Sequence, residues 1–232
     1  NPDSIACVIV EPVAANMGVV VPEEGFLSEL RQLCDEYGAL LIFDEVITGF
    51  RLALGGAEEY FGVTPDLVTY GKIIGGGMPV GAYGGRRDIM SVVSPVGKVY
   101  QAGTLSGNPI AMRAGITQLR ILREERGIYG RIGVLGERLR SGLKKAAEAA
   151  GLPYRVTGIG SLSCLYFTDA EVRDYESAKS SDTGRFAAYF RHMLDHGSYI
   201  GPSQFEALFV SAAHTDEDID KTVKDAEEYF GA

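Results

Sequence analysis

Short apolar runs alternate with longer amphipathic segments over the first half of the chain. The runs are residues 5–10, 39–43, 67–70 and a shorter one at 82–84. Continuous apolar runs of this length are typical of strands buried on both faces of a sheet. Between the first two runs, Phe26, Leu30 and Leu33 recur at helical spacing, and Gly38 occupies a helix C-cap position. Strands linked through helices predict an α/β fold with a mostly parallel sheet.

The pattern changes after about residue 125. A helix is predicted from Pro109 toward Gly127, because Asn108 is a good N-cap residue and Pro is favoured at the first helical position. The later elements expected are helices at 132–150, 182–196 and 215–230, and short strands at 161–167 and 208–212. We therefore expect two parts, residues 1–125 and residues 126–232, of which the second is a smaller α+β domain.

Composition narrows the classes of function. Apolar residues make up 46% of the 232 residues and charged residues 23%, as in ordinary globular domains. The formal net charge of −9 has the wrong sign for binding a phosphate backbone, so no nucleic acid is expected as a partner. The three cysteines form no disulfide or zinc motif, which favours a reducing, cytoplasmic location. No apolar stretch is long enough to span a membrane, and the first residues do not form a signal peptide.

Two charged residues are placed to share one edge of the predicted sheet. Asp44 follows the apolar run that ends at Phe43, and Lys72 comes two residues after the run at 67–70. Ligands bind open α/β sheets at the carboxyl ends of the strands. The pair is equally compatible with a structural ion pair and with a functional site. The glycine-rich segment 71–82 favours a site, because it keeps bulk away from a lysine that could act as a Schiff-base nucleophile.

Two other motif classes are not supported. The segment around Lys72 is not a phosphate-binding Walker loop, because its glycines follow the lysine and Ile73 stands where Ser or Thr is needed. His192 and His196 are four residues apart on a predicted helix and could share a face. The residue after the first histidine is Met193 rather than Glu, and no third ligand is evident in the sequence. We therefore predict no metal site.

Three segments together resemble a known family. They are Phe43-Asp44-Glu45-Val46-Ile47-Thr48-Gly49-Phe50-Arg51, the Lys72 segment, and Ala102-Gly103-Thr104-Leu105-Ser106-Gly107-Asn108-Pro109. They are similar to the pyridoxal-phosphate enzymes of the class-III aminotransferase family, and most closely to its glutamate-1-semialdehyde aminomutase branch. The likeness runs from Ala6 to about Phe230. It implies the end of the large cofactor domain of a fold-type I enzyme followed by the small domain, that is, a C-terminal half without its N-terminal half.

The resemblance implies roles for four residues around the cofactor, pyridoxal 5′-phosphate or pyridoxamine 5′-phosphate. Lys72 would hold the cofactor covalently and then move the proton between substrate and cofactor. Asp44 would pair with the pyridine nitrogen, and Val46 would pack against a face of the ring. Thr104 would reach the phosphate of the other subunit's cofactor, so that a homodimer shares its active sites. Without the resemblance, the residues alone favour an ordinary core role for Val46 and a capping loop for Thr104.

Two further positions distinguish the aminomutase branch. Asn16 would lie near the phenolic oxygen of the cofactor, where many other class-III transaminases have Gln or another residue. Glu206 would be a carboxylate of the small domain facing the substrate, although without the flanking match a solvated loop residue is the favoured interpretation. The reaction implied is transfer of the amino group within glutamate 1-semialdehyde to give 5-aminolevulinate for tetrapyrrole synthesis. Two alternatives remain: a class-III transaminase acting on amines or ω-amino acids, and a non-catalytic fragment that only folds or dimerises. We expect little or no turnover by the chain alone.

Overall fold

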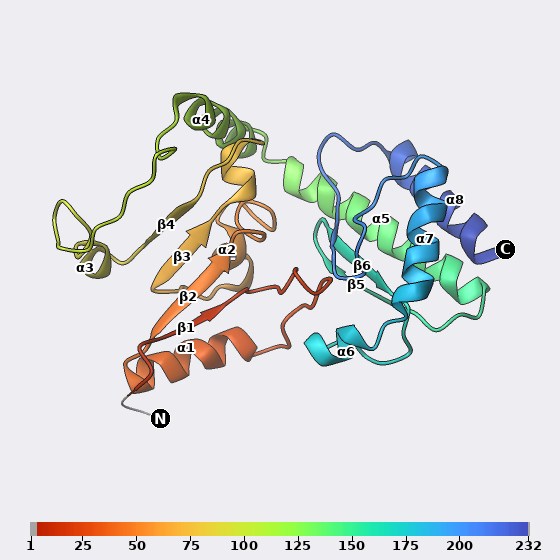
Figure 1. Cartoon of the computed structure of the whole chain (residues 1–232), viewed down its shortest axis with the longest axis horizontal. Coiled ribbons are helices and arrows are strands. Elements are labelled where there is room, and N and C mark those ends of the chain that lie inside the picture. The colour runs from red at the N-terminus through yellow and green to blue at the C-terminus, as the bar shows by residue number, and fades with distance from the viewer. Residues whose placement is uncertain (1–3, 232) are drawn as a thin grey trace. The chain divides into compact units, whose positions relative to one another are not determined.

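The computed structural model describes residues 4–231, which form two compact units along the chain (Figure 1). The first contains the described residues through Pro12 together with Glu23–Arg126, and the second contains Val13–Pro22 together with the described residues from Gly127 onward. The sequence analysis assigned all of residues 1–125 to the first part. Segment 13–22 differs because the buried Tyr166 donates a hydrogen bond from its hydroxyl to the Met17 carbonyl, 2.9 Å away, within the second unit.

The first unit is built on a four-stranded sheet. Its strands are β1 (Cys7–Val10), β2 (Leu40–Glu45), β3 (Leu67–Tyr70) and β4 (Ala82–Gly85), in that spatial order. The pairs β1–β2 and β2–β3 are parallel, which confirms the mostly parallel sheet. β4 is antiparallel to β3. The short connection between them carries no crossover helix, and a parallel return would need one.

Helices cover and flank this sheet. They are α1 (Phe26–Tyr37), α2 (Gly56–Phe61), α3 (Arg87–Met90), α4 (Pro109–Glu124) and the 3₁₀ turn η1 (Lys72–Gly75). Between α1 and the sheet, Leu27 and Cys34 pack with Leu41, Phe43 and other buried apolar side chains. The predicted caps are present. Gly38 ends α1 with a φ of 69°, and the Asn108 side chain accepts hydrogen bonds from backbone N–H groups in the first turn of α4.

One buried carboxylate ties the ends of several of these elements together. Asp66 precedes β3, and its Oδ2 accepts hydrogen bonds from the Leu41 backbone N–H at 2.8 Å and from Arg31 of α1 at 2.7 Å. Its Oδ1 accepts from Arg86, which follows β4, at 2.7 Å. Burial alone would raise the pKa of Asp66, but these donors outweigh it and lower the pKa to about 2. The charged form therefore holds α1, β2 and β4 around the start of β3.

The second unit combines helices with an antiparallel sheet, but the residue ranges of the two units are equally long, so it is not the smaller of the two. Its elements are α5 (Ile128–Ala149), β5 (Arg155–Ile159), β6 (Leu162–Tyr166), α6 (Tyr175–Lys179), α7 (Thr183–Asp195), β7 (Leu208–Phe209) and α8 (Asp216–Gly231). The three strands form an antiparallel sheet in the order β5-β6-β7. Side chains such as Leu143, Phe167, Tyr189 and Met193 fill the core between sheet and helices. β5 and α6 were not predicted, and α5 begins one turn before the predicted start.

The three cysteines, Cys7, Cys34 and Cys164, are all free thiols, which confirms the absence of a disulfide framework. Among the helices that the structure describes, none combines the length and the apolar character that crossing a membrane requires.

Candidate active site

Asp44 lies near the carboxyl end of β2 with its carboxylate held in a defined orientation. The strand extends through Glu45, two residues beyond the predicted end, because Asp44 is paired with Thr69 of β3 in the parallel ladder. Asp44 Oδ1 accepts a hydrogen bond from the Thr69 hydroxyl at 3.2 Å and another from the Val46 backbone N–H at 3.1 Å. Within residues 4–231, Oδ2 has no hydrogen-bond partner. The strand end therefore presents one oriented, half-buried carboxylate with an oxygen available to a ligand.

Lys72 follows the neighbouring strand in a strained conformation. It begins η1 with a φ of 46°, in the left-handed region that non-glycine residues seldom adopt. Strain of this kind is concentrated at functional sites, where the surrounding structure enforces it. The side chain is exposed, and no ion pair joins it to Asp44 in the described part of the chain. The alternative of a structural ion pair is therefore not what the structure contains.

Val46 connects the two strand ends. A Cβ built on Gly71 would lie 3.2 Å from Val46 Cγ1, so the valine side chain lies directly over the residue before Lys72. The strand register and this contact place Asp44, Val46 and the start of η1 at the same edge of the sheet. The sequence predicted that these residues would share this edge, and the structure brings them there.

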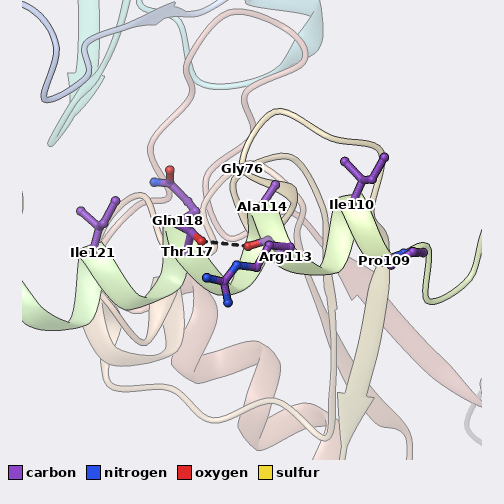
Figure 2. A pocket seen from close by; sticks show the side chains of 8 residues that line it. All are labelled: Gly76, Pro109, Ile110, Arg113, Ala114, Thr117, Gln118 and Ile121. Atoms are coloured by element: carbon purple, nitrogen blue, oxygen red, sulfur yellow. Dashed lines mark hydrogen bonds between the residues drawn. The ribbon is translucent and has the colours of Figure 1, made fainter.

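The glycines of segment 71–82 serve packing more than the sequence analysis expected. A Cβ on Gly76 would lie 2.8 Å from the Ala114 carbonyl of α4, and one on Gly115 would lie 2.3 Å from the Ile74 carbonyl of η1. The backbone of α4 therefore approaches the turn that carries Lys72 as closely as glycine permits. Figure 2 shows Gly76 beside Ala114 and Gln118 on this helix. At these two contacts the small residues make room for a helix rather than for a ligand.

Glu45 is a buried residue of this edge that the sequence analysis did not single out as functional. Its side chain accepts hydrogen bonds from the Ala57 backbone N–H at 2.6 Å, the Thr48 hydroxyl at 3.1 Å and the Glu58 backbone N–H at 3.4 Å. Burial raises the pKa of Glu45, against the lowering effect of these donors. The carboxyl group thereby fixes the start of α2 to the end of β2. It steadies the loop that begins with Val46.

Thr104 lies in the exposed loop that leads into α4. The loop turns through hydrogen bonds from the Ser106 N–H to the Gly103 carbonyl and from the Asn108 N–H to the Leu105 carbonyl. Asn108 then caps the helix through bonds of 3.1 and 3.2 Å to the N–H groups of Ile110 and Ala111. No hydrogen bond or ion pair of the described residues joins Thr104 to Asp44 or Lys72. The structure therefore gives Thr104 the surroundings of a capping loop.

Asn16 and Glu206 both belong to the second unit and are both exposed. The segments that carry them are joined, because the Gly18 N–H donates to the Phe205 carbonyl at 2.8 Å. Tyr166 of β6 lies beneath this junction, and a Cβ on Gly18 would lie only 1.9 Å from its hydroxyl oxygen. The sequence analysis missed Gly18 and Tyr166. The available signals were a glycine two residues after Asn16 and a tyrosine at the end of a short strand that is buried throughout.

Comparisons with known proteins agree with the geometry. The family described as aminotransferase class-III matches residues 1–227. The glutamate-1-semialdehyde 2,1-aminomutase of Acetivibrio thermocellus is 65% identical over 230 residues, which are 99% of this chain and 53% of that protein. The chain spans about half the length of the curated relatives it matches.

Solved structures match over nearly the whole chain. A β-phenylalanine aminotransferase from Variovorax paradoxus has a TM-score of 0.89 at 36% identity, covering 99% of this chain and 53% of that one. A glutamate-1-semialdehyde aminomutase from Pseudomonas aeruginosa, solved in complex with PMP, has a TM-score of 0.83 at 28% identity and covers 97% of this chain and 51% of that one. With a family match over almost all of its residues, this chain belongs to the class-III aminotransferase family.

Proposed function

We propose that this chain is part of a pyridoxal-phosphate-dependent glutamate-1-semialdehyde 2,1-aminomutase, which converts glutamate 1-semialdehyde to 5-aminolevulinate. The observation that carries the proposal is the edge formed by Asp44 and the Lys72 turn. There, an oriented carboxylate and an exposed amine follow adjacent parallel strands. The 65% identity to an aminomutase supports this choice within the family.

The residues present fit the aromatic cofactor. Asp44 Oδ1 is occupied by two donors while Oδ2 remains available, which suits a carboxylate that accepts a hydrogen bond from a protonated ring nitrogen. Val46, lying over Gly71, offers an apolar surface for one face of the ring. When bound, the cofactor supplies the amine or aldehyde that exchanges with substrate and a ring that acts as an electron sink.

Lys72 has two tasks in this proposal. Its Nζ attaches the resting cofactor covalently, and once released it takes a proton from one carbon and returns it to another. The task requires a side chain that is not committed to an ion pair, and Lys72 satisfies this condition in the described part of the chain. The strained backbone at Lys72 fixes the point from which the flexible side chain extends, which supports a defined reach for the amine.

The remaining assignments rest on the family likeness. Asn16 would contact the phenolic oxygen of the cofactor, and Glu206 would face the reacting end of the substrate. The link between their segments through Gly18 and Phe205 supports a common role, because it lets the two residues be positioned together. Thr104 would bind the cofactor phosphate of the partner subunit, and its exposed loop at the start of α4 has the hydroxyl and N–H groups for that purpose.

A homodimer is part of this proposal. One face of α4 carries exposed apolar side chains, with Ile110 at 66% and Ile121 at 41% exposure. Figure 2 shows Ile110 and Ile121 lining a groove on this helix together with Arg113 and Thr117. Apolar side chains gathered on one helix face are typical of a surface that another subunit covers.

A reducing, cytoplasmic location is also part of the proposal, and the free cysteines support it.

A class-III transaminase is the second candidate. It is favoured by the higher structural similarity to the β-phenylalanine aminotransferase, with a TM-score of 0.89 against 0.83 for the aminomutase structure. A transaminase needs a separate keto acceptor, whereas an aminomutase isomerises its substrate without one. The chain would be combined with the half of an aminomutase relative that it does not match, and both reactions would be measured. Formation of 5-aminolevulinate without an added acceptor supports the aminomutase, and turnover only with an acceptor overturns it.

Cofactor attachment is tested separately on the same preparation. Pyridoxal phosphate is added, the adduct is reduced with borohydride, and the labelled lysine is found by peptide mass spectrometry. We expect the label on Lys72, its loss in Lys72→Ala, and its retention in Lys98→Ala, which changes another exposed lysine. Labelling of other lysines alone, or none at all, would favour the non-catalytic fragment.

A further inference from the structure

The C-terminal end of α7 lies against α8 in the second unit. Aromatic side chains make this helix pair rigid, since the rings of Tyr189 and Phe230 stack with centroids 5.9 Å apart. The Tyr229 hydroxyl also donates to the Arg185 carbonyl at 3.2 Å, from α8 to α7. The two helices that carry the side chains on the outer edge of this pair are therefore held against one another.

Three potential metal ligands meet on that edge. His192 and His196, four residues apart on α7, stack with ring centroids 4.0 Å apart. Glu228 of α8 completes the group, and one ligand atom from each of the three residues lies within 4.8 Å of the others. His196 Nε2 is 3.6 Å from Glu228 Oε2. The sequence analysis found no third ligand because Glu228 is 32 positions beyond His196 and becomes a neighbour only through helix packing.

In each of the two histidines, one ring nitrogen forms a hydrogen bond to a backbone carbonyl oxygen. His192 Nε2 lies 2.9 Å from the Asp225 carbonyl oxygen, and His196 Nδ1 lies 2.8 Å from the His192 carbonyl oxygen. A carbonyl only accepts, so each of these ring nitrogens carries the hydrogen. In the neutral ring the other nitrogen then has a free lone pair. A carbonyl that fixes the tautomer in this way is the usual outer partner of a metal-binding histidine.

We propose that His192, His196 and Glu228 bind a divalent first-row transition metal ion, for which Zn²⁺ is the probe. Two imidazoles and one carboxylate suit Zn²⁺ and its neighbours, whereas Mg²⁺ and Ca²⁺ prefer oxygen ligands throughout. Tetrahedral ligands about 2.1 Å from the metal lie roughly 3.4 Å apart. The distance of 3.6 Å between His196 Nε2 and Glu228 Oε2 already matches this spacing. The larger separations among the three ligand atoms, which are at most 4.8 Å, would shorten when the exposed side chains rotate. Water would fill the open coordination position.

Two lysines are the competing cations at this edge. Lys224 Nζ lies 3.6 Å from Glu228 Oε1, which is the oxygen that does not face His196. Lys221 Nζ donates to the His196 carbonyl and to Asp225 Oδ2, each at 2.6 Å, and so is already satisfied. A metal would replace the direct contact of His196 with Glu228 and compete with the weak interaction of Lys224. Bound there, it would clip α7 to α8 and stabilise the second unit.

The test is calorimetric titration of the full chain with Zn²⁺, in a Cys7→Ser background because Cys7 is an exposed thiol. We expect one ion per chain, and at least about tenfold weaker binding in His196→Gln and in Glu228→Gln. The matched controls are His214→Gln, outside the cluster, and Glu227→Gln, an exposed acid next to Glu228 on α8. Both controls should bind as the parent chain does.

Two further measurements test the same metal site. Saturating Zn²⁺ should raise the melting temperature of the parent chain and of both controls by about 5 °C, and that of the two ligand variants by much less. Lys224→Gln should tighten binding, because it removes the cation that competes for Glu228. No saturable binding, or equal affinity in all variants, would overturn the proposal. It would leave only a surface ion pair between His196 and Glu228.

Discussion

At the scale of single residues, the candidate site depends on how one carboxylate is oriented. Asp44 Oδ1 takes both available donors, one from its own loop at Val46 and one from Thr69 on the neighbouring strand. This leaves Oδ2 as the oxygen presented to a ligand. In the proposed function Thr69 would therefore be a positioning residue, which acts on the cofactor through its hydrogen bond to Asp44.

Replacing Thr69 by Val tests this role. Valine has nearly the same shape as threonine but cannot donate a hydrogen bond, so Asp44 loses one of its two constraints. We expect roughly tenfold weaker binding of pyridoxal phosphate, corresponding to one hydrogen bond to a charged group. Cofactor titration by visible absorbance gives the dissociation constant. Thr64→Val, at an exposed position in the same unit, is the control. Equal loss of affinity in both variants would contradict a specific role for Thr69.

The sequence identified Asp44 and Lys72 but not Thr69 or Glu45, and the difference has a physical reason. A charged residue directly after an apolar run can be identified from neighbouring positions, because the hydrophobic pattern predicts where a strand ends. The partner of Asp44 depends on the register between β2 and β3, and the partners of Glu45 depend on a turn that brings α2 back to the sheet. Neither set of contacts can be predicted from residues that are close together in the sequence.

At the scale of secondary-structure elements, buried polar groups fix how helices and strands meet. Asp66 joins α1, β2 and β4 through Arg31, Leu41 and Arg86. Its Arg31 partner is mostly buried, whereas Asp35, the second partner of Arg31, is 68% exposed on its side chain. Exposed ion pairs contribute little to stability, so the buried carboxylate carries most of this interaction.

The stability of the chain should depend on pH through Asp66. Its folded pKa of about 2 is below the ordinary unfolded value near 3.9, so the charged form favours folding. The contribution, about 2 kcal/mol, is complete above pH 4 and is lost as pH falls toward 2. Urea unfolding followed by circular dichroism should show that Asp66→Asn is less stable at pH 6 and that this deficit shrinks below pH 4. Asp35→Asn should cost less than about 1 kcal/mol. A deficit for Asp66→Asn that is independent of pH would contradict the assignment.

The junction between the Asn16 and Glu206 segments makes a second prediction at this scale. Gly18 has a φ of 85°, and a Cβ there would lie 1.9 Å from the Tyr166 hydroxyl oxygen. Gly18→Ala should therefore lower the free energy of unfolding by about 3 kcal/mol, from backbone strain and overpacking together. Gly151→Ala is the matched control, with a φ of 64° and open space around the Cβ, and should cost about 1 kcal/mol. Urea midpoints give both values, and equal costs would show that Tyr166 does not restrict this position.

The elements that the sequence missed are those with little pattern of their own. β5 contains Gly158 and a threonine among few apolar residues, and α2 and α6 are too short for a helical period to emerge. Longer elements such as α4, α7 and α8 were predicted nearly in full, because caps and apolar spacing agree along them. The antiparallel direction of β4 was beyond the sequence pattern, which gives the strand but not its direction.

At the scale of the whole molecule, the chain spans about half the length of the curated relatives it matches. In the proposed function, two surfaces matter for assembly. One would meet the part of an aminomutase that this chain does not match, and the other is the α4 groove proposed for the second subunit. The second can be tested directly, because its apolar side chains are exposed in the single chain.

A charge placed on the α4 groove should prevent dimerisation. Ile110 is 66% exposed, and Ile110→Glu would bury a carboxylate without a partner if a second subunit covers this helix. Val134→Glu is the control, since Val134 is an equally exposed apolar residue of α5 at 68%. Sedimentation of the chain combined with the half of an aminomutase relative that it does not match should show at least a tenfold weaker dimer for Ile110→Glu and no change for Val134→Glu. The dimer would lose Thr104 from the partner's site, so activity should fall with the fraction of monomer. A dimer that tolerates Ile110→Glu as well as Val134→Glu would place the subunit contact away from α4.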